Sequence, residues 1–573
     1  MSKFLSFLPR GFLPRGFLSR IALFAAVSLA ACGTLSQPRP QASPQELSES
    51  NLYDLLLGEI ALQRDDTALA AQTYIEVARR TLDPRVARRA IEVANFARQP
   101  ELALEAAKIW YSVEPASPQA IQVVAALLVS TKRVDEAEPY LEKLLDADGV
   151  NIESGFLQLN RLLAGNPDKA SNLRVVRKLA ARHPQLAQAQ FAVAQAALAA
   201  GDDAGALSAI RQASALRPEW ETAAIFEAQI LQKRSPTEAA NSLGAFIEKN
   251  PGAREARLNY ARALVLDKRY PEARKQFEAL LAANPGNADV VYAVGLLAFQ
   301  LKDFPVAEEN MKRLLTMGYR DPNGVKYLLG QIAEEQKQWP QAIEWYKQID
   351  GGDNALAARM RTANAIAKQG KLDEARAYLK RIEAENEGEQ VQLIVAEAQL
   401  LREANRPRDA YDMLGQALKK DPDQPELLYD FALTAEKLER FDVLESNLRK
   451  LIQVRPDHAH AYNALGYSFA ERNLRLPEAK KLIERALELA PEDYYIVDSL
   501  GWVLYRQGDL KGAAEHLRRA YGARPDAEIG AHLGEVLWVM GERTEADRVW
   551  KESLDVSPEN ETLLKTIKRL KRR

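Results

Sequence analysis

The residues whose side chains most readily bind a metal ion or form a covalent bond are five histidines and a single cysteine. The histidines are His183, His458, His460, His516 and His532. The run Asp457-His458-Ala459-His460 resembles part of a metal site, but no third strong ligand lies near it in the sequence. We therefore expect no metal ion and no bound cofactor.

The cysteine, Cys32, can neither close an intramolecular disulfide nor complete a multi-cysteine zinc site, because the chain has no other. A basic region without acidic residues (residues 1–20) and a short apolar run (residues 21–31) come before it, and this order indicates a secretory signal peptide. Leu29-Ala30-Ala31-Cys32 resembles the lipobox of bacterial lipoproteins. That resemblance implies cleavage after Ala31 and lipidation of the Cys32 sulfur.

The segment around Cys32 also indicates where the chain resides. The apolar run would rise about 16 Å as a helix, well short of the ~30 Å hydrocarbon core of a bilayer. Residues 32–48, rich in Pro, Ser and Gln, cannot build a core and predict a flexible tether after the lipidated cysteine. Gly33 stands where enterobacterial lipoproteins kept at the inner membrane have Asp. The resemblance therefore implies a lipid-anchored protein on the periplasmic side of the outer membrane.

Composition excludes some classes of function. Removing residues 1–31 takes away four positive charges and no negative ones, which moves the formal net charge from −2 to −6. A nucleic-acid binder would carry a basic excess instead. The sequence contains no H-E-x-x-H, G-x-S-x-G, Walker or Rossmann motif, and the repeats described next leave no segment for a catalytic domain. We expect neither enzymatic activity nor a small-molecule substrate.

Prolines recur at a period of 33 to 35 residues in two sets. They are Pro184, Pro218, Pro251 and Pro285, then Pro422, Pro456, Pro491, Pro525 and Pro558. This is the period of the tetratricopeptide repeat, a pair of antiparallel helices. The sequence therefore predicts an all-α fold, a right-handed superhelix (α-solenoid) of roughly fifteen helix pairs.

The clearest repeat, residues 494–527, shows why the period produces helix pairs. Gly501 and Ala513 stand where two helix backbones approach closely, so a larger side chain would overpack the contact. Leu500 and Leu517 fill the seam between the helices. Pro525 lacks an amide hydrogen and ends the second helix. Elsewhere a proline starts the second helix instead, as at Pro271, Pro305, Pro340 and Pro477.

The repeats divide the chain into blocks. We expect divergent N-terminal repeats over residues 49–251, middle repeats over 252–422, the best-matching repeats over 423–558 and a basic capping helix over 559–573. The stretches where the pattern is irregular predict bends or insertions; these are residues 145–184 and the joints near 315–323, 350–356 and 384–390. The basic C-terminus either complements the dipole of a capping helix or contacts an acidic partner or an anionic surface.

Repeats of this kind usually bind a partner segment along the face formed by their first helices. The first-helix positions that would form such a groove in the best repeats are His460, Asn463, Tyr467, Tyr495, Asp498, Trp502, Tyr505, Glu535 and Trp538. Exposed aromatic residues there would anchor a partner. The alternative is that they pack against neighbouring repeats, which we favour for Tyr505 and Trp538 and leave open for Tyr467 and Trp502.

Residues 463–550, with the segments 52–63 and 87–99, resemble a proteobacterial family of outer-membrane tetratricopeptide lipoproteins. Its members include the adaptor of a periplasmic carboxyl-terminal processing protease. The resemblance implies that this chain binds and activates such a serine protease and presents its protein substrates, peptidoglycan hydrolases, to it. Two alternatives stay open: a scaffold for exopolysaccharide secretion or outer-membrane assembly, and a peptidoglycan-active enzyme, which the absence of a catalytic domain argues against.

Overall fold

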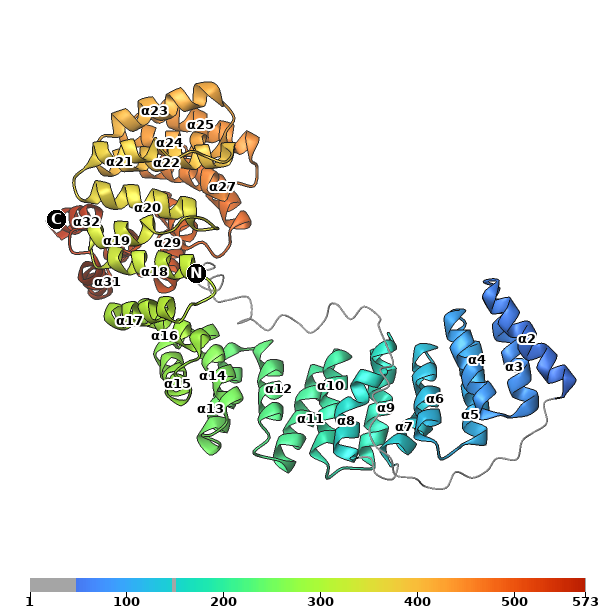
Figure 1. Cartoon of the computed structure of the whole chain (residues 1–573). Coiled ribbons are helices and arrows are strands. Elements are labelled where there is room, and N and C mark those ends of the chain that lie inside the picture. Colours follow the sequence, from blue (N-terminus) through green and yellow to red (C-terminus); the bar gives the residue numbers. More distant parts are fainter. Residues whose placement is uncertain (1–47, 147–150, 572–573) are drawn as a thin grey trace. The chain divides into compact units, whose positions relative to one another are not determined.

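The computed structural model describes residues 48–146 and 151–571, and within them 31 α-helices and one short 3₁₀-helix, with no strand (Figure 1). This confirms the predicted all-α fold. The helices form fifteen consecutive pairs followed by one last helix, as the repeat count predicts. The predicted signal peptide, Cys32 and all of the predicted tether except Ser48 lie outside the described residues.

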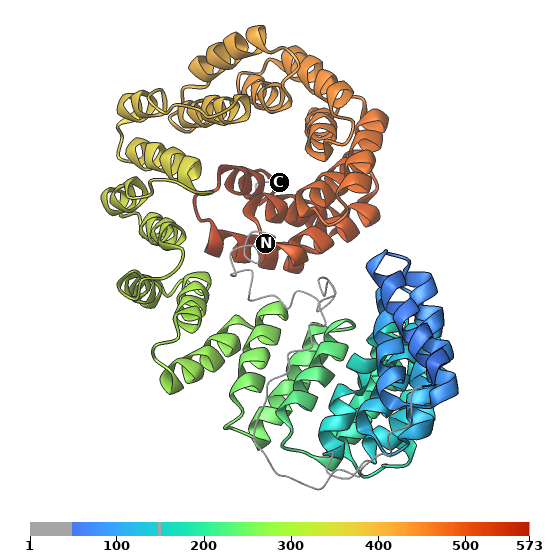
Figure 2. The same cartoon turned by 45° about the vertical axis from the view of Figure 1, so that its right-hand side comes forward.

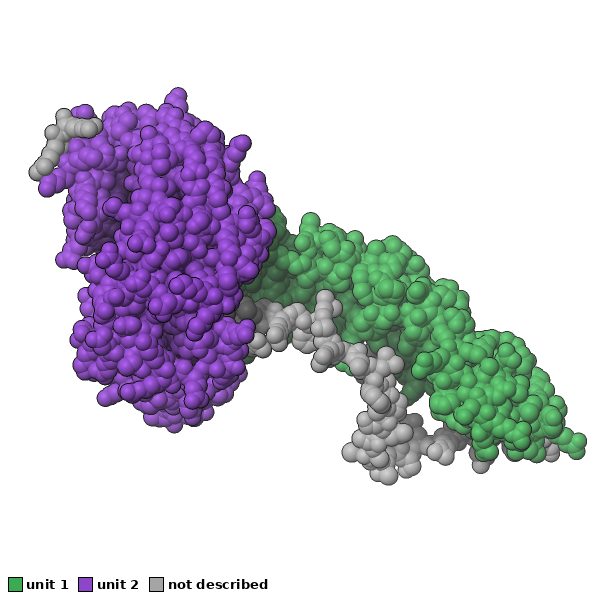
Figure 3. All heavy atoms as spheres, turned by 90° about the horizontal axis from the view of Figure 1, so that it is seen from above, with its two compact units in different colours: residues 1–313 green, residues 314–573 purple. Residues whose placement is uncertain are grey.

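The chain divides into two compact units, residues 1–313 and 314–573, coloured separately in Figure 3. The helices of the first unit are α2 (Glu49–Gln63), α3 (Thr67–Thr81), α4 (Pro84–Phe96), α5 (Pro100–Val113), α6 (Pro118–Ser130), α7 (Val134–Leu145), α8 (Ile152–Leu162), η1 (Leu163–Gly165), α9 (Lys169–Ala181), α10 (Ala187–Ala199), α11 (Asp203–Leu216), α12 (Glu221–Gln232), α13 (Pro236–Lys249), α14 (Arg254–Leu266), α15 (Tyr270–Ala283) and α16 (Ala288–Gln300). The boundary between the units falls within α17 (Phe304–Thr316), just before the irregular joint predicted at 315–323.

The second unit continues the same alternation of first and second helices. Its helices are α18 (Pro322–Glu335), α19 (Trp339–Lys347), α20 (Ala355–Lys368), α21 (Leu372–Leu379), α22 (Glu387–Glu403), α23 (Pro407–Lys420), α24 (Pro425–Lys437), α25 (Phe441–Val454), α26 (Ala459–Glu471), α27 (Leu476–Leu489), α28 (Tyr494–Arg506), α29 (Leu510–Ala523), α30 (Ala527–Met540), α31 (Arg543–Val556) and α32 (Glu561–Lys571). In Figure 2 these helices, yellow-green to dark red, follow a curved course.

Small residues set the contact within each helix pair. A Cβ added at Gly501 would lie 2.6 Å from Leu517 Cγ and 3.1 Å from the main-chain oxygen of Ala513, so only glycine fits that approach. Ala513 itself is fully buried. The turn between α28 and α29 places Gly508 at φ +90°, in the left-handed region that ends helices at low cost in glycine. The small-residue pattern read from the sequence is therefore the packing pattern of the pairs.

The irregular stretches keep the repeat but change its helices. Helix α19 has 9 residues and α21 has 8, whereas α22 has 17. The loops that follow the two short helices coincide with the joints predicted near 350–356 and 384–390. The second helices of these two repeats are therefore too short to cover the first helices along their whole length.

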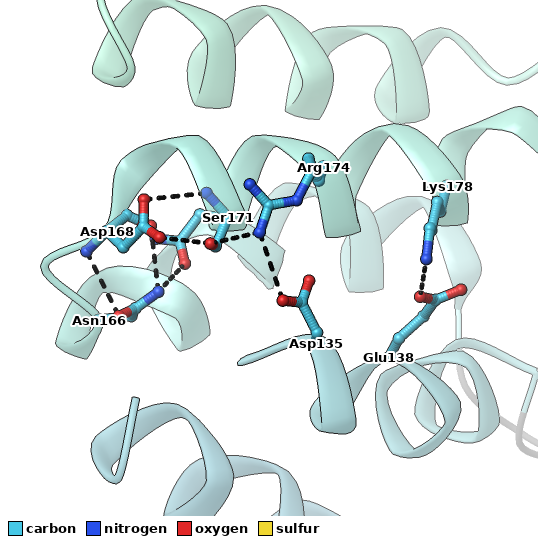
Figure 4. A network of polar contacts seen from close by, with 8 residues as sticks. Asp135, Glu138, Asn166, Asp168, Ser171, Arg174 and Lys178 are labelled. Atoms are coloured by element: carbon cyan, nitrogen blue, oxygen red, sulfur yellow. Dashed lines mark hydrogen bonds and ion pairs between the residues drawn. The ribbon is translucent and has the colours of Figure 1, made fainter. Parts of the chain in front are cut away.

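The stretch 145–184 contains a polar cluster that holds its irregular turn (Figure 4). Asn166, after the 3₁₀ turn η1, is buried and donates to the main-chain oxygen of Asp168 (3.0 Å). Asp168 caps α9 by accepting from the main-chain N–H of Ser171 (3.1 Å). Arg174 on α9 donates to Asp135 on α7 (3.3 Å), which links two successive second helices. These contacts stabilise the irregular turn and tie α9 to α7.

Candidate partner-binding site

The first helices of the second unit form one continuous face, which we call the first-helix face; its helices are α18, α20, α22, α24, α26, α28 and α30. Many successive first helices pack directly on one another, as α20 does on α22, α22 on α24, α26 on α28 and α28 on α30. The second helices α27 and α29 have no comparable contact within the described part of the chain. The array therefore curves toward the first-helix face, the side on which a partner segment would be enclosed.

Pairs of polar side chains join neighbouring first helices along this face. The pairs are Glu334 with Arg361, Lys368 with Glu403 (2.7 Å), Arg402 with Asp430 (2.5 Å), Glu471 with Trp502 (2.8 Å) and Asp498 with His532 (3.0 Å). Burial raises the pKa of the Glu334 carboxyl and of the Asp430 carboxyl, although the arginine beside each lowers it. These pairs fix the spacing of the helices, and a buried carboxylate left without its cation would destabilise the array.

At the C-terminal repeats, three of the predicted groove residues, Tyr467, Asp498 and Trp502, form one cluster around the buried His532 ring. Trp502 is 4% exposed, and its ring stacks on the His532 ring with centroids 4.1 Å apart and an interplanar angle of 22°. His532 Nδ1 lies 3.0 Å from Asp498 Oδ2, and Tyr467 Oη lies 3.5 Å from His532 Nε2. Burial lowers the pKa of the His532 imidazole. The charge of Asp498, the hydrogen bond to Asp498 and the charges of Glu471 and Glu528 together outweigh burial and raise that pKa.

The next part of the predicted groove is occupied by the last helix. Tyr505 Oη donates to Glu535 Oε1 (3.0 Å), and Arg569 of α32 donates to the other oxygen of the same buried carboxylate. Burial and the Glu535 charge raise the pKa of Tyr505 to about 12. Trp538 packs against Trp550, with ring centroids 5.5 Å apart. Of the two interpretations of the basic C-terminus, this geometry favours the capping helix.

The remaining predicted residues lie at the edge of the cluster. His460 is half exposed and lies 3.7 Å from Asp493, Tyr495 is 42% exposed, and Asn463 is half-buried. His458 accepts the main-chain N–H of Ala461 at Nδ1 (3.1 Å) and so caps α26. Among the described residues no group of three or more His, Cys, Asp or Glu side chains could hold a metal ion. Partner binding by the predicted groove residues stays a prediction, with His460 and Tyr495 the accessible ones.

A groove that sequence reasoning missed lies on the same face, over α18, α20 and α22. Its volume is about 600 Å³, and its lining combines an apolar floor with amide and charged groups. The lining residues are Glu334, Glu335, Lys337, Trp339, Ala357, Met360, Arg361, Asn364, Leu379, Ala396, Gln399 and Leu400. A signal for it in the sequence is the recurrence of amide side chains at the repeat period, at Gln331, Asn364 and Gln399, of which Asn364 and Gln399 line the groove.

The amide row suits a main-chain ligand. Side-chain amides both donate and accept hydrogen bonds, as a peptide group does. Gln399 donates to Glu403 (2.9 Å), and Asn364 makes no side-chain hydrogen bond to any described residue. Trp339, Met360 and Leu400 provide an apolar floor beside the amides. The groove can therefore hold an extended polypeptide through its main chain and one apolar side chain.

No helix in the described ranges is both long enough and apolar enough to cross a bilayer.

Comparisons with known proteins bear on the whole array. The family model described as "Tetratricopeptide repeat" matches residues 231–288, 292–355, 395–443 and 470–528. The TPR repeat-containing protein PA4667 of Pseudomonas aeruginosa is 34% identical over 488 residues, which cover 85% of this chain and 82% of that protein.

Among solved structures, yeast Tom70 matches 91% of this chain and 95% of its own, with 14% identity and a TM-score of 0.34. The Thermus thermophilus protein TTC0263 matches 31% of this chain and 96% of its own, with 24% identity and a TM-score of 0.29. At these scores the likenesses say nothing about partners.

Proposed function

The chain belongs to the tetratricopeptide-repeat family, whose members are typically non-enzymatic scaffolds for protein–protein interaction, and from this premise we propose a specific role. We propose that it is an envelope adaptor, anchored to the outer membrane through Cys32, that binds and activates a periplasmic carboxyl-terminal processing serine protease. It presents peptidoglycan hydrolases to that protease, which supplies all of the bond-breaking chemistry.

The groove over α18, α20 and α22 is the observation that supports the adaptor role most. It is open to solvent on the first-helix face and has main-chain-like amides at Asn364 and Gln399. An adaptor that presents different substrates needs a site that reads the peptide main chain more than particular side chains. The buried cluster around Trp502 cannot serve without rearrangement, because its groups already satisfy one another.

The membrane anchor is supported by sequence alone. The lipobox-like residues Leu29, Ala30 and Ala31 come before Cys32, and α2 begins at Glu49, so a tether of about 16 residues would join the lipid to the first repeat. Cys32→Ser should leave the fold intact and release the protein from the outer membrane. Fractionation of cells that express each form measures this, and a serine variant still in the outer-membrane fraction would contradict the anchor.

Affinity capture from the native envelope tests the adaptor role. The wild-type chain should recover a serine protease whose activity rises when the chain is added. Asn364→Arg/Gln399→Arg, which fills the groove with two long cations, should lose the substrate hydrolases from the complex. Gln453→Arg, at an exposed position of the second helix α25, is the matched control and should capture what the wild type captures. Recovery of a polymer-export complex in place of a protease would contradict the proposal.

A further inference from the structure

The first helix, α2, exposes an apolar stripe that nothing in the described chain covers. Its residues are Leu52 (49% exposed), Tyr53 (67%), Leu56 (55%) and Ile60 (47%). At helical spacing these side chains lie along one side of α2, while Gly58 and Ala61 are buried against the rest of the repeat. A helix that is apolar on both sides is ordinarily buried on both sides.

Part of the stripe is the surface on which repeats stack. When α2 and α28 are aligned on Gly58 and Gly501, Tyr53 corresponds to Ile496 and Ile60 to Val503, and those two residues are both 0% exposed. There the second helix of the preceding repeat, α27, packs against α28. Helix α2 has no such helix before it among the described residues. The stripe therefore has the shape and chemistry to receive another helix.

The other end of the array does not have this feature. Helix α32 covers the last repeat and is anchored there by Arg569 on Glu535. Its outward side carries Lys565 and Lys568 and only one large exposed apolar residue, Leu564. Repeat arrays ordinarily need a polar outer surface at each end to stay soluble. Within residues 48–146 and 151–571, one end is closed in this way and the other is left apolar.

We propose that the stripe pairs with the same stripe of a second copy of this chain, forming an antiparallel α2–α2 contact with two-fold symmetry. Antiparallel pairing about Leu56 brings Leu52 of one copy to Ile60 of the other. It also brings Glu49, in the first turn, to the end of the partner copy's helix, where Arg64 lies. Neither Glu49 nor Arg64 has an ion-pair partner among the described residues. The surface is thus complementary to itself in its apolar residues and in charge.

The other occupants fit less well. Helix α2 carries Glu49, Asp54 and Glu59 and no Lys or Arg, whereas helices that lie on membranes have cations on their polar face. The predicted tether, residues 33–47, offers only Leu35 and Leu47 as large apolar residues. A helix of 15 residues is about 22 Å long, so the contact is smaller than the ~800 Å² per partner of a standard interface. We expect a weak, concentration-dependent dimer.

Sedimentation velocity of the purified full chain tests the proposal. All forms carry Cys32→Ser, so that no lipid contributes to association. Between about 1 and about 100 µM, a range that covers weak interfaces, the parent form should shift from monomer to dimer. Leu56→Asp should stay monomeric over this range. Val556→Asp, a change at an apolar residue of α31 that is 67% exposed, is the matched control and should dimerise like the parent.

Charge exchange identifies the partner as a second copy. Glu49→Arg alone and Arg64→Glu alone should each weaken the dimer at least several-fold, and the double exchange in one chain should restore it. A parent form that stays monomeric throughout would overturn the proposal, as would a Leu56→Asp variant that still dimerises. A monomeric parent whose stripe is instead needed to bind vesicles, or to retain a different protein, would overturn it equally.

Discussion

Gly466→Ala is the substitution whose cost the structure defines most directly. The added Cβ would lie 2.8 Å from the main-chain oxygen of Ala479 and 2.7 Å from Ile483 Cγ1, both on α27. Backbone and a branched carbon cannot move aside cheaply, so α26 and α27 must separate. Overpacking costs about 1–3 kcal/mol, and replacing a helical glycine by alanine returns about 0.5–1 kcal/mol. We expect a net destabilisation of up to about 2.5 kcal/mol, centred near 1 kcal/mol.

Gly522→Ala, in α29, is the matched control. A Cβ there meets no atom within 4 Å, so only the gain in helix propensity remains, about 0.5–1 kcal/mol. Repeat arrays open locally, so a single unfolding midpoint is a poor measure. Hydrogen exchange of the α26 and α27 amides reports the local free energy instead, and a loss of 1.4 kcal/mol speeds exchange about tenfold. Equal exchange in the two variants would refute the packing described for these helix pairs.

Three further predictions concern the second unit. The raised pKa of His532 means that its pair with Asp498 stabilises the fold fully below the ordinary histidine pKa of about 6.5 and loses this contribution as the pH rises through the raised value. Between about pH 6 and pH 9, the local free energy of opening of α28 and α30, measured by hydrogen exchange and corrected for the intrinsic rate, should therefore fall more for the wild type than for Asp498→Asn. Parallel falls would contradict this. Glu439→Gly, at φ +57° in the turn after α24, should raise the local stability of α24 and α25 by about 0.5–1 kcal/mol, seen as slower hydrogen exchange there, and faster exchange would count against the strain. Arg569→Glu puts a second carboxylate beside buried Glu535 and should release α32, seen as fast hydrogen exchange there; unchanged protection would show that the ion pair does not hold the helix.

The period of the prolines and small residues was enough to predict the fold. Gly501 and Ala513 lie at the close approach of two helices, as their small size predicts. Pro271 and Pro477 lie in the first turn of second helices, as predicted. Each of these roles depends on residues within one repeat. Period and residue size specify such local contacts directly.

The candidate site was less predictable, because its contacts cross from one repeat to the next. The pattern places Asp498 on the first-helix face among the residues expected to meet a partner. In the structure Asp498 is buried by its pair with His532, a residue 34 positions later. The groove over α18, α20 and α22 lies in the two repeats whose second helices, α19 and α21, are short, and periodicity does not specify those lengths. The sequence also does not show which apolar residues of α2 remain exposed, because this helix is apolar on both sides.

Site-specific photocrosslinking in living cells tests the central claim, that a partner polypeptide binds along the first-helix face of the second unit. The crosslinking residue replaces Gln399 in the groove or, as the matched control, Gln453 on the exposed side of α25. We predict adducts with envelope proteins, a serine protease or its substrates, from position 399 and none from position 453. Adducts from position 453 alone, or the same adducts from both positions, would contradict the account.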